Sequence, residues 1–249
     1  MDRIYRVEYH GSPRYAVERD GTFRLVDGDA FDGFATDEVV RAPRLLAPIE
    51  PSKIVAVGLN YKDHAAEQHS PLPPEPLIFI KPSTSVIGPG EAIRIPPGVG
   101  RVDHEAEVGV VIRKRAYRVP KERAGEYILG LTCINDVTAR ELQKRDGQFT
   151  RSKGFDTFGP IGPCIAPLPS TTVDVEGWVN GSRRQASNTR ELIFPIDELV
   201  AFITAVMTLL PGDIISTGTP AGIGPIRAGD TVTIKVQSVG ELTNPVVDA

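Results

Sequence analysis

Glycine and proline divide this chain into short segments, and that feature limits the folds open to it more than any other. The sequence contains 24 glycines and 22 prolines among 249 residues. Both residue types interrupt regular structure, because proline lacks a backbone donor and glycine is conformationally free. At the same time 41% of the residues are hydrophobic, which is enough to build a core. We therefore expect a folded chain of short elements joined by many turns.

The apolar segments between these breaks mostly have the length and pattern of β-strands. Predicted strands cover residues 4–9, 14–17, 23–26, 53–58, 108–112, 128–134, 161–166, 173–175, 213–216 and 231–236. One amphipathic helix is predicted from Ile196 to Leu210, where apolar residues recur at helical spacing until Pro211-Gly212 would end it. Strands outnumber helices and do not alternate with them, so we predict a mainly β, α+β fold rather than a doubly wound sheet.

The first 47 residues differ in organisation from the rest of the chain. Short alternating segments separated by turn residues indicate a small antiparallel sheet there. Pro43, Pro48 and Pro51 then mark a junction, and the buried strand at 53–58 begins the larger unit. We predict a small N-terminal β subdomain over residues 1–47 and one main domain over residues 48–249.

Charge and hydropathy exclude several broad classes of protein. The net charge of −4 argues against a nucleic-acid binder. No apolar run approaches the roughly 18 to 20 residues that cross a bilayer, and the first residues lack the apolar stretch of a secretory signal. Cys133 and Cys164 are far apart in sequence, a pattern more typical of buried thiols than of a disulfide. We expect a cytoplasmic protein with neither a nucleic-acid nor a membrane partner.

Acidic residues cluster where one predicted strand begins. Because alternate residues of a strand share a face, Glu105 and Glu107 would project together, and Asp103 could lie beside them. A solvated strand end explains this pattern in the ordinary case. However, neighbouring carboxylates repel each other unless a cation lies between them or one takes up a proton. Oxygen ligands of this kind favour Mg²⁺, Mn²⁺ or Ca²⁺ over zinc.

A second polar group follows the predicted strand at 128–134. If Asp136 begins a helix, Arg140 and Gln143 lie on its face four and seven residues later. An aspartate that caps a helix, with an aspartate–arginine pair on the surface, would explain the same pattern without any functional role.

A histidine and a glutamate form a third candidate group. Asp63 could start a short helix that places His64 and Glu67 three residues apart on one face. A carboxylate at that distance can orient the imidazole and raise its basicity, as a general base for water requires. An exposed pair without a catalytic role is also compatible with the sequence. The proline-rich residues 68–76 that follow could form a lid or a plain linker.

Two loops complete the set of candidate motifs. Residues 151–160 place Lys153 among glycines and aromatic residues, and residues 218–225 could lay backbone N–H groups against an anion. The second loop lacks the lysine and hydroxyl residue of a P-loop, so an ordinary turn is the simpler interpretation. The sequence has no Gly-x-Ser-x-Gly motif, and a serine hydrolase is therefore unsupported.

Together these motifs closely resemble the fumarylacetoacetate hydrolase family, from about Pro48 to Val247. The shared motifs keep their order and spacing, and they cover residues 58–67, 79–90, 103–107, 135–143, 153–160 and 218–222. The resemblance implies a mixed β-roll of the type formed by the C-terminal domain of that family. It also implies a homodimer that acts on small 2-oxo acids or β-dicarbonyl compounds.

The resemblance also assigns expected roles to single residues. Glu105, Glu107 and Asp136 would bind Mg²⁺ or Mn²⁺. His64 and Glu67 would form a catalytic dyad on a short helix that closes over the substrate, with Lys153 beside the reacting oxygen. The candidate substrate contacts are Lys81, Arg140, Gln143 and Thr219. His104 departs from the family pattern, in which many relatives have tyrosine.

The reaction expected from the resemblance proceeds through a metal-stabilised enolate, which isomerisation, decarboxylation and hydrolysis share. The amino-acid sequence around residues 145–160 most resembles that of family members of the 2-hydroxyhepta-2,4-diene-1,7-dioate isomerase and 5-carboxymethyl-2-oxo-hex-3-ene-1,7-dioate decarboxylase type. These members act in aromatic catabolism. An acylpyruvate (fumarylpyruvate-like) hydrolase and an oxaloacetate decarboxylase are alternative enzymes. A non-catalytic oxoacid-binding protein on the same fold is the alternative of a different class.

Overall fold

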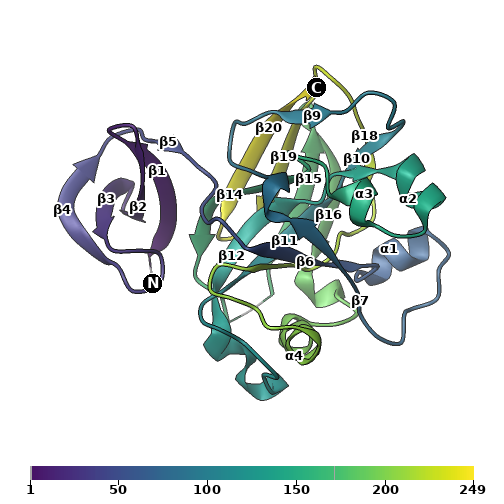
Figure 1. The fold of residues 1–249 in the computed structure, drawn as a ribbon, viewed down its shortest axis with the longest axis horizontal. Helices are drawn as coiled ribbons and strands as arrows, with labels where there is room; N and C mark the ends of the chain where they lie inside the picture. The colour runs from purple at the N-terminus through teal and green to yellow at the C-terminus, as the bar shows by residue number, and fades with distance from the viewer. Residues whose placement is uncertain (1, 171) are drawn as a thin grey trace.

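Strands dominate the structure, as the frequent glycine and proline breaks predict. The computed structural model describes residues 2–170 and 172–249. The described residues form three sheets with a few short helices, arranged as a main body and a smaller lobe at the N-terminal end (Figure 1). This is the mainly β, α+β architecture expected from the sequence.

The N-terminal lobe is one end of the largest, 12-stranded sheet, and its strands are antiparallel in the order β4-β3-β2-β1. Its strands are β1 (Arg3–Tyr9), β2 (Ser12–Arg19), β3 (Thr22–Asp27) and β4 (Phe34–Val40), and β5 (Arg44–Leu45) pairs with β1. The lobe, coloured purple in Figure 1, joins the main body where Ile4 of β1 pairs with Ile165. The small N-terminal β subdomain is therefore present, while its boundary at residue 47 stays a prediction.

The central sheet of the main body has the order β14-β12-β11-β17-β6-β7. Its strands are β6 (Lys53–Gly58), β7 (Leu77–Pro82), β11 (Ala106–Ile112), β12 (Ile128–Asn135), β14 (Gly159–Ala166) and β17 (Ile214–Ser216), and β8 (Val86–Ile87) pairs with β14. Every residue of β11, β12 and β14 is buried, which explains their continuous apolar sequences. These three strands form the centre of the core.

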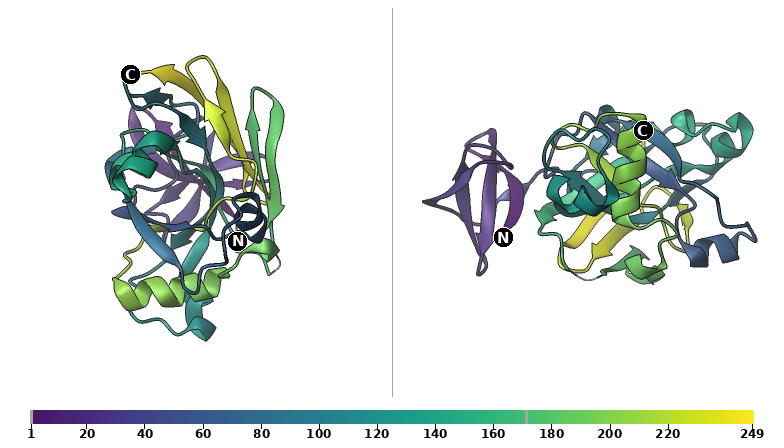
Figure 2. Two further views of the ribbon diagram at one scale, coloured as in Figure 1. Left: turned by 90° about the vertical axis from the view of Figure 1, so that its right-hand side faces the viewer. Right: turned by 90° about the horizontal axis from the view of Figure 1, so that it is seen from below.

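Two smaller sheets complete the roll. The five-stranded sheet contains β16 (Ser182–Asn188), β15 (Asp174–Val179), β19 (Thr231–Val236), β20 (Gly240–Asp248) and β9 (Ile93–Ile95). It packs against β11, β12 and β14, so that the two sheets enclose the core (Figure 2). The three-stranded sheet contains β13 (Thr138–Ala139), β10 (Val102–His104) and β18 (Gly224–Ile226).

The helices are short and lie at the edges of the sheets. They are α1 (Lys62–Glu67), α2 (Arg140–Asp146), α3 (Thr150–Lys153) and α4 (Ile196–Val206), with 3₁₀ turns at Ser83–Ser85, Lys121–Tyr127 and Thr189–Glu191. None of the helices in residues 2–170 and 172–249 is long and apolar enough to cross a membrane.

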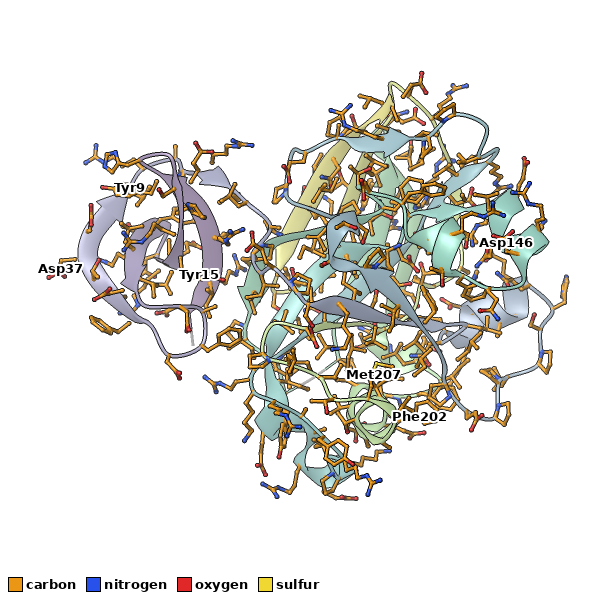
Figure 3. The ribbon with its side chains drawn as sticks, viewed as in Figure 1. Tyr9, Tyr15, Asp37, Asp146, Phe202 and Met207 are labelled. Atoms are coloured by element: carbon orange, nitrogen blue, oxygen red, sulfur yellow. The ribbon has the colours of Figure 1, made fainter. Side chains whose placement is uncertain are left out.

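The prediction that α4 continues to Leu210 was wrong. The helix ends at Val206, and Met207, which follows its last turn, is already extended with φ −146° and ψ 151° (Figure 3). Leu209 then exchanges two backbone hydrogen bonds of 2.9 and 3.0 Å with Ala116. This pairing buries Leu209 completely, whereas Leu210 is 42% exposed, so the helical apolar spacing does not continue as a buried face beyond Val206.

Candidate active site

Three acidic side chains meet at one end of the central sheet. Glu105 directly precedes β11, Glu107 lies within it, and Asp136 directly follows β12. The two strands are antiparallel with Ala106 opposite Asn135, so the three residues lie at the same level. Each is at most 5% exposed, and one carboxylate oxygen from each lies within 4.8 Å of the other two.

Asp136 does not begin a helix, so that part of the sequence prediction was wrong. Thr138 and Ala139 pair as a short strand with Asp103 and Val102 of β10, and helix α2 begins only at Arg140. The chain must leave β12 in extended form to make this pairing. Arg140 therefore approaches the acidic cluster from the first turn of α2, not from the same helical face as Asp136.

Arg140 connects the cluster to Asp103. Its Nε donates to Asp103 Oδ2 at 2.8 Å, its Nη1 donates to Gln143 Oε1 at 2.9 Å, and its Nη2 donates to Glu105. Asp103 also accepts two hydrogen bonds from Arg101, at 2.7 and 3.0 Å. Asp103 is therefore held by two guanidinium groups and lies outside the group of three carboxylates.

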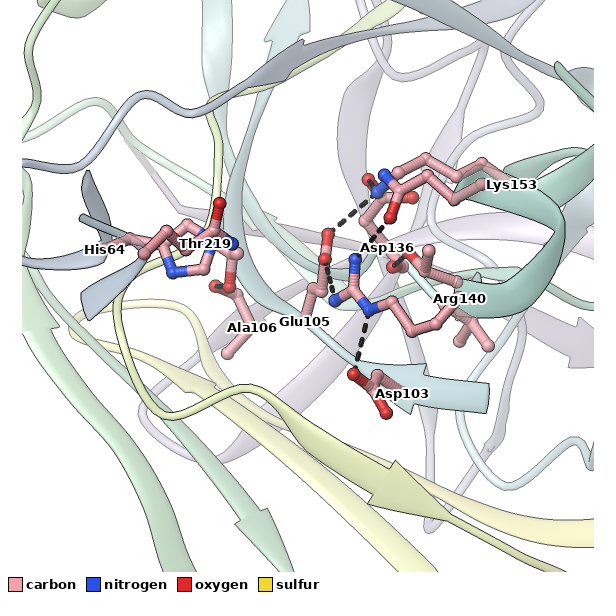
Figure 4. A network of polar contacts seen from close by, with 12 residues as sticks. His64, Asp103, Glu105, Ala106, Asp136, Arg140, Lys153 and Thr219 are labelled. Carbon is pink, nitrogen blue, oxygen red and sulfur yellow. Dashed lines mark hydrogen bonds and ion pairs between the residues drawn. The ribbon is translucent and has the colours of Figure 1, made fainter. Parts of the chain in front are cut away.

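Two buried lysines face the same carboxylates. Lys153, at the end of α3, donates to Glu105 Oε2 at 2.8 Å and also to Asp136. Lys81, on β7, is fully buried and donates to the other oxygen of Asp136 at 2.6 Å. Figure 4 shows Lys153 and Arg140 converging on Glu105 and Asp136. The acidic cluster is thus neutralised on one side by fixed cations.

The electrostatic environment separates the two glutamates. Burial raises the pKa of Glu107 to about 8, and the negative charges of Asp136 and Glu105 add to this. Burial would also raise the pKa of Glu105, but Lys153 and Arg140 outweigh it and hold that pKa well below its usual range. The carboxylates are therefore as close together as the sequence predicts. The raised pKa of Glu107 favours its protonated form, which reduces the repulsion between them.

Lys153 stays positively charged in this environment. Burial opposes the charge of its ammonium group, but the carboxylates of Asp136 and Glu105 outweigh burial and raise the pKa of Lys153. The same Nζ lies 5.0 Å from the centre of the Phe79 ring. A fixed positive charge next to the carboxylates is thus a permanent property of the site.

The residues present fit a divalent metal ion. Three buried carboxylates offer hard oxygen ligands, which Mg²⁺ and Mn²⁺ prefer. In addition, the buried side-chain atoms without a hydrogen-bond partner in the described residues are Tyr61 Oη, both ring nitrogens of His104 and Asn135 Nδ2. Each belongs to a residue next to, or three positions from, a predicted site residue. Buried polar atoms of this kind are typical of places where an ion, water or ligand completes the network.

The histidine–glutamate pair forms as predicted, with its helix beginning at Lys62 rather than Asp63. His64 Nδ1 lies 2.9 Å from Glu67 Oε2, and His64 is only 5% exposed. Asp63 accepts hydrogen bonds from the backbone N–H of His64 at 2.7 Å and from Ser187 at 2.8 Å. The short helix α1 is therefore held at its start by Asp63 and on one face by the His64–Glu67 contact.

The loop at residues 218–222 connects the dyad to the acidic cluster. Gly218 N donates to Glu107 Oε2 at 2.9 Å, and Gly222 N donates to Glu67 Oε1 at 3.0 Å. The Thr219 hydroxyl donates to the carbonyl of Ala106 at 3.0 Å, and Figure 4 shows these two residues together. We refer to residues 218–222 as the Gly-Thr-Pro loop.

The predicted substrate contacts have other partners in this structure. Lys81 is bound to Asp136, Arg140 to Asp103 and Glu105, and Gln143 to Arg140. Contact of these residues with a substrate stays a prediction. Lys81 and Arg140 contact the acidic side chains directly, and Gln143 is linked to them only through Arg140, which their spacing in the sequence does not reveal.

Sequence reasoning missed two residues that contact the site. Ser216 ends β17 and donates to Glu107 Oε2 at 2.5 Å, and Gln185 on β16 donates to Thr219 Oγ1 at 2.8 Å. Ser216 could have been noticed because it ends a predicted strand just before the Gly-Thr-Pro loop. Gln185 belongs to no local motif and comes close only through the packing of the second sheet.

Comparisons with known proteins identify the family and the fold of this chain. A family model described as fumarylacetoacetate (FAA) hydrolase C-terminal matches residues 53–247. An uncharacterized protein of Archaeoglobus fulgidus is 48% identical over 231 residues, which cover 92% of this chain and 91% of that protein.

Solved structures resemble the whole chain. A 5-carboxymethyl-2-hydroxymuconate delta-isomerase from Mycobacterium smegmatis is 44% identical with a TM-score of 0.93, covering 99% of this chain and 100% of that chain. A 2-hydroxyhepta-2,4-diene-1,7-dioate isomerase from Mycobacterium marinum is 40% identical with a TM-score of 0.92, covering 100% and 99%. The fold expected from the sequence is thereby confirmed.

Proposed function

The chain belongs to the fumarylacetoacetate hydrolase family, and from this we infer that it is a divalent-metal-dependent enzyme acting on 2-oxo acids. The reaction we propose is of the 2-hydroxyhepta-2,4-diene-1,7-dioate isomerase or decarboxylase type. The observation that carries the proposal is the group of three buried carboxylates within 4.8 Å, with the Lys153 ammonium donating to two of them. The isomerase names of two solved relatives at 40% and 44% identity support the substrate class.

Each group of the site has a distinct part in this proposal. Mg²⁺ or Mn²⁺ held by Glu105, Glu107 and Asp136 would polarise the 2-oxo group of the substrate. Lys153 places a positive charge next to the oxygen on which negative charge develops when a neighbouring C–H or C–C bond breaks. The Lys153 ammonium group is held by hydrogen bonds to Glu105 and Asp136. It is therefore already in position before the reaction and need not reorient as negative charge develops on the substrate.

His64 is the group that we propose moves protons. His64 Nδ1 lies next to Glu67 at 2.9 Å, and Nε2 lies 2.9 Å from the side-chain amide Nε2 of Gln68. We propose that Nε2 exchanges protons with the substrate, which requires the Gln68 amide to move away from it. In isomerisation of the 2-hydroxy-2,4-diene, the 2-hydroxyl group loses its proton, a proton is added at C5, and the product is the 2-oxo-3-ene. His64 would accept the first proton and supply the second. In decarboxylation it would only supply the proton after CO₂ has left.

A substrate panel tests the proposal. Purified protein with Mg²⁺ or Mn²⁺ is assayed on 2-hydroxyhepta-2,4-diene-1,7-dioate, an acylpyruvate and oxaloacetate. We expect the highest kcat/KM on the heptadienedioate. If no compound is converted although metal and oxoacid both bind, the chain is an oxoacid-binding protein on the same fold, and the enzymatic proposal is wrong.

Acylpyruvate hydrolysis is a second candidate function, which the intact His64–Glu67 pair favours, because hydrolysis requires a base that activates water. We predict that His64→Ala lowers acylpyruvate hydrolysis by about 10²- to 10⁴-fold, the usual contribution of a general base. Oxaloacetate decarboxylation should fall much less, since it needs no activated water. Steady-state kinetics of one variant on both substrates measures the difference. His69→Ala, at an exposed histidine five residues later, is the matched control, and equal losses on both substrates would contradict the assigned role.

A further inference from the structure

We propose that Gln185 is a positioning residue that locks the Gly-Thr-Pro loop onto the strand carrying the acidic cluster. The proposal rests on the proposed function where it concerns metal and oxoacid binding. Gln185 lies on β16 of the second sheet and is 1% exposed. It is far in sequence from every motif discussed above.

The absence of a side chain at Gly177 provides the space that the Gln185 side chain occupies. Gly177 lies opposite Gln185 on the neighbouring strand β15. A Cβ atom added to Gly177 would lie only 2.7 Å from Gln185 Oε1 and 3.3 Å from Gln185 Cβ. A glycine at this position is therefore needed for the glutamine to reach across to β11.

Backbone groups fix the orientation of the Gln185 amide. Its Oε1 accepts from the N–H of Ala106 at 2.9 Å, and its Nε2 donates to the carbonyl of Pro220 at 2.8 Å. A backbone N–H can only donate and a carbonyl can only accept, so the flipped amide would lose both bonds. The Nε2 group must therefore also be the donor in its 2.8 Å contact with Thr219 Oγ1.

This orientation determines what the Thr219 hydroxyl can do. The hydroxyl gives its only proton to the carbonyl of Ala106 at 3.0 Å and accepts from Gln185. Gln185, Thr219 and Ala106 thus form a closed ring of hydrogen bonds. Towards a substrate, the Thr219 hydroxyl can offer only a remaining lone pair.

The ring connects the predicted metal ligands to the predicted dyad. Ala106 is the residue between Glu105 and Glu107, and Figure 4 shows it next to Thr219. On either side of Thr219, Gly218 N donates to Glu107 and Gly222 N donates to Glu67. Movement of this loop would therefore disturb a ligand carboxylate and the partner of His64 together.

The Gly-Thr-Pro loop packs closely against β16 at Gly222. A Cβ on Gly222 would lie 2.1 Å from the carbonyl oxygen of Arg184, and its φ of +97° favours glycine. Gln185 is the side chain that ties the loop to β11 at this contact. Loss of its three hydrogen bonds should loosen the loop while the sheets remain assembled.

The test compares Gln185→Met with Asn244→Leu in the full chain. Asn244 is also a buried amide, 2% exposed, and it donates to Gly88 O at 2.8 Å and Glu91 O at 2.9 Å. Both variants lose buried hydrogen bonds, so both should have a lower Tm. Only Gln185→Met should weaken Mn²⁺ binding to the metal-free protein, by about 10- to 100-fold as for other residues that orient ligands.

A second readout does not depend on the proposed function. In metal-free protein, amide hydrogen exchange at Gly218 and Gly222 should be faster in Gln185→Met than in the wild type or in Asn244→Leu. If Gln185→Met does not fold, Gln185→Glu replaces it, because the carboxylate keeps the acceptor for Ala106 N and loses both donated bonds. Unchanged exchange at the two glycines overturns the role of Gln185. Faster exchange in a protein that binds no Mn²⁺ and converts no oxoacid keeps the role of Gln185 and overturns the proposed function.

Discussion

Glu105→Gln is expected to lower kcat/KM by at least about 10³-fold, or ~4 kcal/mol of transition-state stabilisation. The substitution keeps the size of the side chain and one acceptor oxygen, which can accept from Arg140 or from Lys153 but not from both, because the two donate to different oxygens of Glu105. It removes one of the three charges that would hold the metal ion, so Mn²⁺ binding should weaken by more than about 100-fold. Steady-state kinetics and calorimetric titration measure the two effects.

Glu141→Gln is the matched control for this variant. Glu141 lies on α2 beside Arg140, but it is exposed to solvent. The same loss of one negative charge there should leave kcat/KM and the Kd for Mn²⁺ unchanged. A Glu105→Gln variant with normal turnover would show that Glu105 does not belong to a catalytic metal site.

Lys153→Met is expected to separate catalysis from metal binding. Lys153 would stabilise the charge that develops on the substrate, so we expect kcat to fall by about 10²- to 10³-fold. Its ammonium group donates to Glu105 and Asp136, and its removal leaves the cluster more negative. Mn²⁺ affinity should therefore be retained or increased. Kinetics on the best substrate and Mn²⁺ titration of the same variant measure both quantities.

Lys144→Met provides the comparison, because Lys144 is an exposed lysine on the neighbouring helix α2. Its loss should change neither quantity. If Lys153→Met loses Mn²⁺ binding together with kcat, the lysine supports the structure of the cluster and does not act on the substrate. An unchanged kcat would contradict any role in catalysis.

The local sequence pattern correctly predicted features that depend on residues close together in the chain. The alternation of apolar residues at 231–236 predicted β19 with its observed bounds. The spacing of His64 and Glu67 predicted their contact, because three residues of helix bring two side chains together. Likewise, alternation along a strand predicted that Glu105 and Glu107 approach each other.

Other features depend on contacts between residues far apart in the sequence. Asp136 is followed by a strand because Thr138 and Ala139 pair with β10, over 30 residues earlier. Leu209 leaves the helical pattern because it pairs with Ala116. The position of Gln185 beside Thr219 depends on the packing of one sheet on another. Nothing in the local sequence at these positions distinguishes the observed structure from the predicted one.

The prediction that Asp136 binds the same metal ion as Glu105 and Glu107 came from the family resemblance and not from the spacing of these residues. From the sequence alone, Asp136 was equally compatible with a helix cap. The structure shows why it belongs to the cluster, since β12 ends opposite the start of β11 and both ends are buried. Lys81 and Lys153 then offset the charge that such burial would otherwise make unfavourable.

Calorimetric titration of the metal-free wild-type protein with Mn²⁺ tests the central claim most directly, with Glu105→Gln as the reference. The three carboxylates within 4.8 Å predict one ion bound per chain, and this ion should restore turnover of 2-hydroxyhepta-2,4-diene-1,7-dioate. Wild-type protein that binds no Mn²⁺, or binds it as weakly as Glu105→Gln, would contradict the claim that this cluster is a metal centre.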